Sequence, residues 1–317
     1  MGSSKGAVKL GAGREWAEQS PYDRYFDFIE PDADRFDVLF NHIQKLGLNS
    51  VVIPVEKNRH FLIFPRGKNL KPDAGGSFPF RGQSPVVLTA HYDRVPGSPG
   101  ANDNSVAVFL LLNAALKLNE LHADRWIIIF TDKEELEKGE GIREQGSFSL
   151  AEKLRLWGFG KARIFNFDCC GTGDTLVFSS TTDHLLNKNK KPGFRRAGQI
   201  VKLLRESVLA ATRRLRINKV LTVPIPFSDD AGFLKGGIPA QTITTLPAGE
   251  AVPYASLLSS RPDLIDLIIS GSIGESAARQ LLPETWRCIN SPLDTYLRLT
   301  PEHYDRIVRF AVELCMV

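Results

Sequence analysis

Continuous apolar runs recur along the chain and predict buried β-strands. The run at residues 125–131 is unbroken and rich in isoleucine, which is typical of a strand buried on both faces of a parallel sheet. Similar strands are predicted at residues 86–90, 161–168, 176–180, 220–224 and 238–246. Residues 50–55 and 60–65 are shorter β-type runs separated by four polar residues, which predicts a hairpin.

Helical patterns lie between several of these runs. In residues 32–46 the apolar side chains fall on one helical face, and Asp32 or Asp34 is a candidate N-cap. Residues 104–118 are almost entirely apolar, which predicts a buried helix. The other predicted helices are residues 146–157, 198–215 and 301–317. Residues 251–282 show only helical patches, whose leucines and isoleucines fit either the core or the rim of a pocket.

The alternation of strands and helices predicts an α/β fold. We expect a three-layer α/β/α sandwich around a mixed, mostly parallel sheet. The chain has 317 residues and no internal repeat, so we interpret residues 1–317 as a single domain. Residues 1–20 are rich in glycine and serine, and we expect them to form a loose N-terminal segment.

The composition is that of an ordinary globular protein, with 43% hydrophobic and 24% charged residues. A formal charge of +4 is too small to indicate a nucleic-acid partner. The N-terminus lacks a signal-like apolar core, and no run approaches about 18 apolar residues. We therefore expect a cytoplasmic protein with no membrane partner. The oligomeric state stays open.

Cysteines are few for a chain of this length. They are Cys169, Cys170, Cys288 and Cys315. No pair has the spacing of a zinc finger or a redox motif, so we expect no disulfide framework.

Acidic residues and one histidine follow the predicted strands. His91 and Asp93 follow the first buried run, and the others are Glu134, Glu135, Asp168, Asp229 and Asp230. Asp103 lies in a loop rich in glycine and proline that precedes the helix at residues 104–118. Ligands of open α/β sheets bind at the carboxyl ends of the strands. The alternative is that each acid simply ends its strand at the surface.

Several buried acids in one crevice repel one another unless cations hold them together. Histidine and carboxylates are ligands of zinc, and two metal ions about 3.5–4 Å apart can share one carboxylate. A further carboxylate beside the ligands can act as a general base. The pattern therefore favours a hydrolytic site with one or two divalent ions, zinc first, with cobalt or manganese as alternatives.

Five sequence blocks resemble the zinc-dependent aminopeptidases with co-catalytic metals, metallopeptidases of the MH clan that are related to the glutaminyl cyclases. The blocks are HYD with SPGANDN (91–104), FTDKEE (130–135), FNFD (165–168), FSDDAGFLKGGIPA (227–240) and PETWRCINSPLDT (283–295). They occur in the order that the family has. The resemblance covers the chain from about residue 86 to the C-terminus and implies hydrolysis of N-terminal residues from peptide substrates.

The resemblance also implies roles for individual residues. His91 and Asp168 would bind one metal, Glu135 the second, and Asp103 would bridge both. Glu134 would be the catalytic base that takes a proton from water and passes it to the leaving amine. Three further acids would support the ligands from behind, with Asp93 orienting His91. They are Asp93, Asp229 and Asp294.

One position departs from the family pattern. The final block carries a histidine ligand for the second metal in the family, and this chain has Asn290 there. An amide oxygen is a poor zinc ligand, so we expect the second metal site to be weak or vacant. Cys288, two residues upstream, is a candidate substitute ligand, although a buried apolar role is the usual one for a cysteine.

This departure leaves two alternatives to an active aminopeptidase. One is a catalytically impaired relative that acts as a binding or scaffolding protein. The other is a glutaminyl cyclase-like acyltransferase, an alternative that the change at position 290 makes weaker. Its single metal would be held by residues matching Asp103, Glu135 and Asn290, which is the altered site.

Overall fold

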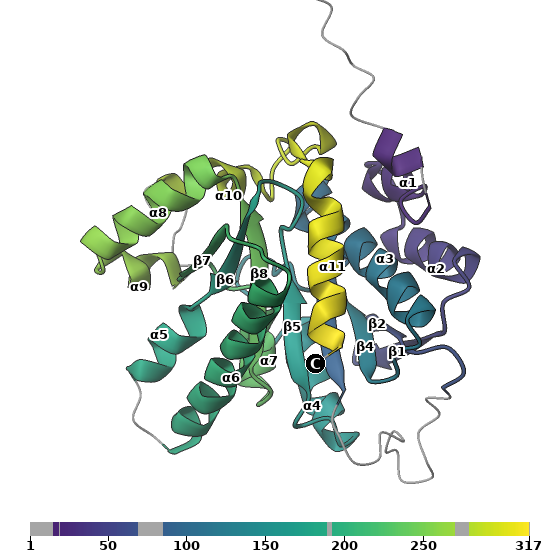
Figure 1. Ribbon diagram of the computed structural model, residues 1–317, viewed down its shortest axis with the longest axis horizontal. Helices are drawn as coiled ribbons and strands as arrows, with labels where there is room; N and C mark the ends of the chain where they lie inside the picture. Colours follow the sequence, from purple (N-terminus) through teal and green to yellow (C-terminus); the bar gives the residue numbers. More distant parts are fainter. Residues whose placement is uncertain (1–14, 19, 69–84, 189–191, 270–278, 317) are drawn as a thin grey trace, which may run out of the picture.

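The computed structural model describes residues 15–18, 20–68, 85–188, 192–269 and 279–316. Within them one sheet of eight strands has the order β1-β2-β4-β3-β5-β8-β6-β7 (Figure 1). The strands are β1 (Ser50–Val55), β2 (Asn58–Ile63), β3 (Val86–His91), β4 (Trp126–Thr131), β5 (Arg163–Phe167), β6 (Thr175–Ser179), β7 (Val220–Val223) and β8 (Ala240–Leu246). The predicted hairpin is β1 and β2, joined by a two-residue turn.

The centre of the sheet is parallel and both of its flanks contain antiparallel pairs. Strand β3 pairs in parallel with β4 and β5, and β5 pairs in parallel with β8. The pairs β1–β2, β2–β4 and β6–β8 are antiparallel. This confirms the predicted mixed sheet. Because β7 is parallel to β6, it runs opposite to β3, β4 and β5, so the expectation that all the acid-bearing runs end at one edge is wrong for β7.

Helices cover both faces of the sheet. The longer ones are α2 (Arg35–Lys45), α3 (Val106–Glu120), α4 (Gly146–Leu156), α6 (Pro192–Arg214), α8 (Ala248–Ser260) and α11 (Tyr304–Cys315). The shorter ones are α1 (Tyr25–Ile29), α5 (Thr181–Asn187), α7 (Asp229–Lys235), α9 (Leu264–Ile269) and α10 (Glu284–Cys288). None of the described helices combines the length and the apolar character needed to cross a membrane.

Side-chain alternation along the strands builds a core on each face. On one face Leu88, Phe130 and Phe165 pack with residues of α3, α6 and α11, among them Phe109 and Phe310, and these helices lie side by side in Figure 1. On the other face neighbouring strand residues pack against α4 and α7. Helix, sheet and helix therefore form the three predicted layers, which confirms the fold class.

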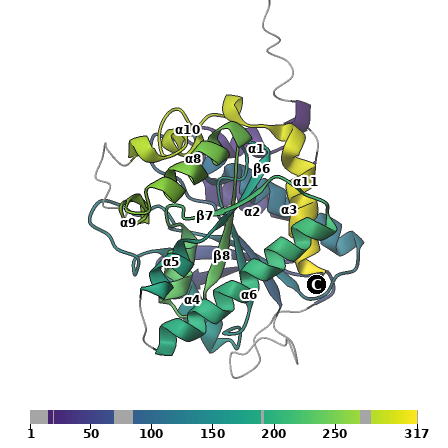
Figure 2. The same ribbon diagram turned by 60° about the vertical axis from the view of Figure 1, so that its left-hand side comes forward.

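A third apolar cluster lies beside β7. It joins Tyr254 of α8, Ile268 of α9 and Trp286 of α10, and Figure 2 shows these three helices grouped at one end of the molecule. Residues 251–282 were expected to be either core or pocket rim. Residues 270–278 lie outside the described part. The others contribute to both, since Leu258 is buried in this cluster, while Ile268 also lines a cavity described below.

Several local predictions need correction. Of residues 1–20, residues 1–14 and 19 lie outside the described part, but Glu15–Glu18 form a 3-10 helix. Trp16 packs against Tyr22, Tyr25 and Tyr304, so this part of the segment is not loose. The predicted helix at residues 104–118 begins at Val106, because an irregular turn with non-helical angles at Asp103 and Asn104 precedes it.

Candidate metal centre

The predicted acids and His91 converge at the carboxyl edge of the parallel strands. His91 is the last residue of β3 and lies opposite Thr131, the last residue of β4. Asp168 directly follows β5, and Glu134 and Glu135 follow β4 at a distance of a few residues. The continuous apolar runs thus place each polar side chain at the point where its buried strand ends. The alternative that these acids lie scattered at the surface is wrong.

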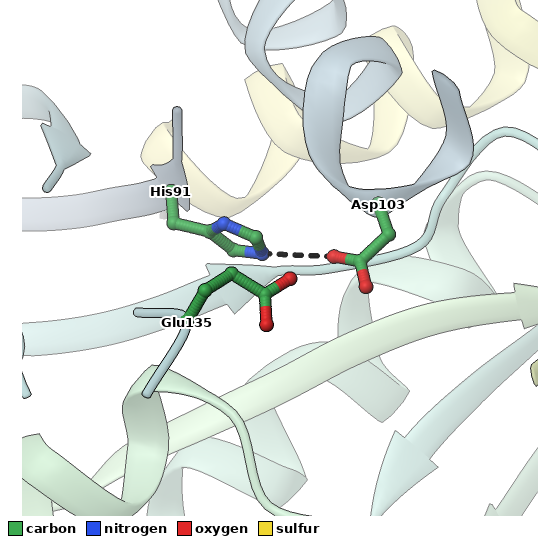
Figure 3. Close-up of side chains that lie close together, drawn as sticks. All are labelled: His91, Asp103 and Glu135. Carbon is green, nitrogen blue, oxygen red and sulfur yellow. Dashed lines mark ion pairs between the residues drawn. The ribbon is translucent and has the colours of Figure 1, made fainter. Parts of the chain in front are cut away.

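Three potential ligands face one another in Figure 3, from the ends of β3 and β4 and from the loop before α3. His91, Asp103 and Glu135 each offer one ligand atom, and these atoms lie within 4.8 Å of one another. The Nε2 atom of His91 is 3.0 Å from Oδ1 of Asp103 and 3.7 Å from Oδ1 of Asp168. Ligand atoms of Asp103, Asp168 and Cys169 also lie within 4.8 Å of one another and form a second group. Asp103 belongs to both groups.

The charges in this cluster are strongly unbalanced. Burial opposes a charge on His91, but the carboxylates of Asp103, Asp168 and Asp93 outweigh it and raise the pKa of the imidazole well above its ordinary value. Burial and the negative charge of Asp103 raise the pKa of Glu135 well above its usual range. The site therefore carries more negative charge than its own groups neutralise.

Buried polar atoms without hydrogen-bond partners are concentrated here. Nδ1 and Nε2 of His91, Oε1 of Glu135 and Oδ1 of Asp168 are buried and make no hydrogen bond. Buried polar groups are normally paired, and an unpaired one costs about 1–3 kcal/mol. Imidazole nitrogen and carboxylate oxygen are donors that suit zinc, cobalt and manganese. The residues present therefore fit the divalent ion that the sequence predicts.

Asp93 supports two parts of the cluster at once. Its carboxylate accepts hydrogen bonds from the backbone N–H groups of Glu134 and Glu135, at 3.1 and 3.0 Å. One of its oxygens also lies 3.4 Å from Nδ1 of His91. Asp93 thus fixes the backbone after β4 relative to the imidazole, as expected of a residue that orients a metal-binding histidine.

Asp294 holds the loop that carries Asp103 in position through its backbone. The two carboxylate oxygens of Asp294 accept the backbone N–H groups of Asn102 and Asp103, at 2.9 and 3.0 Å. The side chain of Asn104 donates to the carbonyl oxygen of Phe167 and accepts the backbone N–H of Cys169, the two residues on either side of Asp168. These contacts place the two acids Asp103 and Asp168 relative to each other.

Arg35 of α2 also organises this loop, a role that no sequence motif indicates. Its guanidinium donates to the carbonyl oxygens of Tyr92, Asp93, Pro99 and Gly100 and to the hydroxyl of Ser105. The side chain is buried, and burial lowers its pKa to about 9. Gly100 has φ +61, and a Cβ there would approach the same guanidinium to 2.8 Å, so the close approach of backbone and arginine requires glycine.

Glu134, the predicted base, lies beside the ligand cluster. Its Oε1 accepts a hydrogen bond of 3.2 Å from Nε2 of Gln145, whose own carbonyl oxygen accepts the backbone N–H of Gly232. Burial raises the pKa of Glu134 well above its ordinary value. Gln145 is a further residue that the sequence did not reveal, because it comes from the segment before α4.

Asp229 reaches the centre by a different route from the one expected. It begins α7 and accepts a hydrogen bond from the hydroxyl of Thr131 at the end of β4. Its other oxygen is buried without a partner, and burial raises its pKa to about 6. Asp229 therefore lies near the predicted ligands although β7 runs in the opposite direction to β4.

Asn290 lies against the cluster and contacts it through its amide nitrogen. Its Nδ2 donates to Oε2 of Glu135 at 3.2 Å. Cys288, the candidate substitute ligand, belongs to neither ligand group found among the described residues; it lines a separate small cavity with Asp294. The cysteine that approaches the centre is Cys169.

A cavity of about 240 Å³ opens beside the centre. Asp168, Cys169 and Asn290 of the candidate centre line it, its other polar residues are Ser228, Thr242, Thr244 and Arg279, and the rest of its wall is apolar. The apolar residues are Ile225, Pro226, Phe227, Ile268, Leu282, Trp286 and Ile289. The chemical groups at one end and the apolar wall at the other describe a site for a ligand with an apolar side chain.

Solved structures with this fold include peptide-processing enzymes. A zinc-dependent exopeptidase from Parabacteroides distasonis has a TM-score of 0.59 at 16% identity, over 94% of this chain and 97% of that one. A glutaminyl cyclase from Porphyromonas gingivalis has a TM-score of 0.56 at 15% identity, with coverages of 92% and 94%. At these identities the similarity establishes the fold alone.

A zinc aminopeptidase from Bacillus subtilis is a longer relative. It is 19% identical over 81% of this chain, with a TM-score of 0.49. This chain spans 49% of that protein, about half its length. No curated protein matches the sequence significantly.

The family model for peptidase family M28 matches residues 75–313. This range is well over half of the 317-residue chain. It includes every element that contributes a predicted ligand, from β3 to the segment that carries Asn290 and Asp294. The chain therefore belongs to peptidase family M28.

Proposed function

We propose that this protein is a metal-dependent aminopeptidase, which hydrolyses N-terminal residues from peptides. The observation that carries the proposal is the convergence of His91, Asp103, Glu135 and Asp168 beside Glu134, with buried donor atoms that have no other partner. Membership of family M28 supports the same chemistry. The similar structure of a zinc-dependent exopeptidase agrees with it.

His91, Asp103, Glu135 and Asp168 would hold the metal, with Asp103 shared between two positions. A bound divalent ion polarises a substrate carbonyl and makes water more acidic. Asp93 and Asp294 would keep the ligand-bearing segments in place through their contacts with backbone N–H groups. These two acids act through other residues and need no contact with the substrate.

Glu134 is the group that we propose as proton carrier. Its buried position raises the pKa of its carboxyl group, and a carboxylate with a raised pKa is a stronger base near neutral pH. Gln145 donates to Oε1 and so fixes the carboxylate in one orientation. Glu134 can then take a proton from water during attack on the peptide carbonyl and give it to the leaving amine.

The charge balance favours a substrate with a free α-amino group. Asp93, Asp103, Asp168, Glu134 and Glu135 lie close together, so the site attracts an ammonium group even after a divalent ion is bound. The neighbouring apolar cavity of about 240 Å³ accepts one large apolar side chain. We therefore expect N-terminal leucine- or phenylalanine-like residues to be preferred.

A substrate panel tests this proposal. The metal-free protein is reconstituted with Zn²⁺, Co²⁺ or Mn²⁺ and assayed on aminoacyl arylamides with free and with acetylated α-amino groups. We expect metal-dependent release from the free amines only, with Glu134→Gln reducing kcat at least about 100-fold while metal content stays unchanged. No metal-dependent turnover on any free amine, or equal turnover by Glu134→Gln, would contradict the proposal.

A second candidate function rests on the hydrogen bond between Asn290 and Glu135. That bond replaces a ligand contact, so the chain is also suited to being a relative that binds peptides without cleaving them. Metal content after dialysis separates the candidates: no bound ion favours the binding protein, and one or two favour an enzyme. Formation of pyroglutamate from a peptide with N-terminal glutamine would instead indicate a cyclase.

A further inference from the structure

We propose that the Cys169 thiolate is a ligand of the divalent ion that Asp103 and Asp168 hold, so that the centre is a mixed nitrogen, oxygen and sulfur site. The proposal rests on the metal-binding part of the proposed function and does not depend on peptidase activity. It predicts a preference for zinc and cobalt over manganese, because thiolate is a soft donor.

The geometry brings the sulfur to the ligand cluster. Sγ of Cys169 and carboxylate oxygens of Asp103 and Asp168 all lie within 4.8 Å of one another. A second donor points to the same place: Nε2 of His91 is fully buried without a hydrogen bond and lies 3.0 and 3.7 Å from oxygens of Asp103 and Asp168. An ion bound to the two acids is thus within reach of both nitrogen and sulfur.

The backbone of Cys169 is fixed on both sides. Its N–H donates to the side-chain oxygen of Asn104, and its carbonyl oxygen accepts from the hydroxyls of Thr244 and Thr245. Its φ is +52, a left-handed conformation that is unfavourable for residues other than glycine, asparagine and aspartate. The backbone conformation therefore gives no reason for a cysteine at this position.

Core packing does not explain Cys169 either. Its side chain is only 5% exposed, yet it belongs to none of the three apolar clusters formed by the described residues. Cys170, the next residue, is part of a core cluster and donates its thiol to the carbonyl oxygen of Ile243 at 3.3 Å. Cys169 instead faces the carboxylates and lines the cavity beside the centre.

The chemistry explains what the cysteine adds. Zinc and cobalt accept sulfur donors together with nitrogen and carboxylate donors, whereas manganese favours oxygen. His91, Asp103 and Asp168 supply one nitrogen and two carboxylates to the ion that they would share. A sulfur ligand from the segment after β5 would complete the four donors that zinc usually takes.

Cobalt spectroscopy tests the proposal. We expect Co²⁺ added to the metal-free wild-type protein to give a sulfur-to-cobalt charge-transfer band in the near ultraviolet that saturates with the binding of the ion. Cys170→Ala keeps the band, and Cys169→Ser loses it. Competition titration should show that Cys169→Ser weakens Zn²⁺ binding at least about tenfold, since even residues that only support ligands contribute 10–100-fold. Mn²⁺ binding should change less.

A measurement on the wild-type protein avoids reliance on the folding of a variant. X-ray absorption of the zinc-loaded protein should show one sulfur scatterer at about 2.3 Å. Bound metal without a sulfur signal, or a band that persists in folded Cys169→Ser, would overturn the proposal. Failure of the protein to bind Co²⁺ or Zn²⁺ would overturn it together with the metal-dependent function. A sulfur signal without peptidase activity would overturn the proposed function alone.

Discussion

Asn290 is the predicted ligand position that departs from the family pattern. The resemblance to the co-catalytic aminopeptidases implies a histidine there, and in this chain Nδ2 of Asn290 donates to Glu135. Glu135 keeps one oxygen, Oε1, buried and without a partner. In the proposed centre Glu135 and Asp103 would hold the second ion, and the resemblance implies a further donor at position 290.

Replacing Asn290 by histidine should restore that donor. We expect Asn290→His to strengthen binding of the second divalent ion at least about tenfold and to raise peptidase activity, because the imidazole gives Glu135 and Asp103 a matching ligand. Elemental analysis of metal per chain after dialysis measures the effect. Asn290→Ala is the matched control, since it also breaks the bond to Glu135 but adds no ligand. Equal metal content in Asn290→His and wild type would contradict this placement of Asn290.

At the scale of elements, helix α2 and the loop from Tyr92 to Ser105 form one unit. Arg35, the first residue of α2, donates to five oxygens of that loop from a buried position. The planar guanidinium reaches several acceptors at once, which the single ammonium group of lysine does not. The loop that carries Asp103 therefore depends on an element outside the parallel strands.

We expect Arg35→Lys to lower the free energy of unfolding by about 3 kcal/mol, because it leaves buried carbonyl oxygens unsatisfied. It should also weaken metal binding by loosening the segment before Asp103. Denaturant unfolding of the metal-free protein and zinc titration measure the two effects. Arg94→Lys is the control: Arg94 also donates to carbonyl oxygens but is less buried, so its loss should be smaller. An Arg35→Lys protein as stable as wild type would show that the loop is held by other contacts.

Elements buried on both faces could be predicted from the sequence. β3 and β4 are almost entirely apolar and β5 is mainly apolar, so the ends of these runs located His91, Glu134 and Asp168 without a structure. Asp34 caps α2 by accepting the N–H of Asp37, as one of the two proposed caps.

Elements fixed by distant contacts could not be predicted in this way. The direction of β7 is set by its pairing with β6, and its four residues, of which only Val223 is buried, carry no sign of it. The role of Arg35 depends on acceptors more than fifty residues away in the chain. Short helices such as α5 and α10 have too few residues for a periodic pattern to be distinctive, since tertiary packing rather than propensity stabilises them.

At the scale of the whole molecule, buried histidines distant in sequence from the metal ligands couple folding to pH. His42 packs against Phe109 inside the larger core, and burial lowers its pKa. His60 of β2 is completely buried, and its Nδ1 accepts the backbone N–H of Asp132 at 3.1 Å. Burial lowers the pKa of His60 to about 4. Both rings are therefore neutral in the folded protein.

The sign of the pH effect follows from these lowered values. The unfolded chain binds a proton on His60 below about pH 6.5, whereas the folded protein does so only near pH 4. The contribution of neutral His60 to the free energy of unfolding is thus fully present above pH 6.5 and is lost as the pH falls toward 4. The slope for one proton is about 1.4 kcal/mol per pH unit, so the total loss is roughly 3 kcal/mol.

His60→Gln should therefore reduce the acid dependence of stability. Glutamine does not titrate and keeps an acceptor for the N–H of Asp132, so the difference between variant and wild type isolates the histidine from the many carboxylates that titrate in both. Denaturant unfolding of metal-free protein between pH 4 and 7 gives the two slopes. His122→Asn is the control, because His122 is exposed and its φ of +53 suits asparagine. If wild type and His60→Gln lose stability in parallel as the pH falls, proton uptake by His60 does not contribute to the loss of stability in acid.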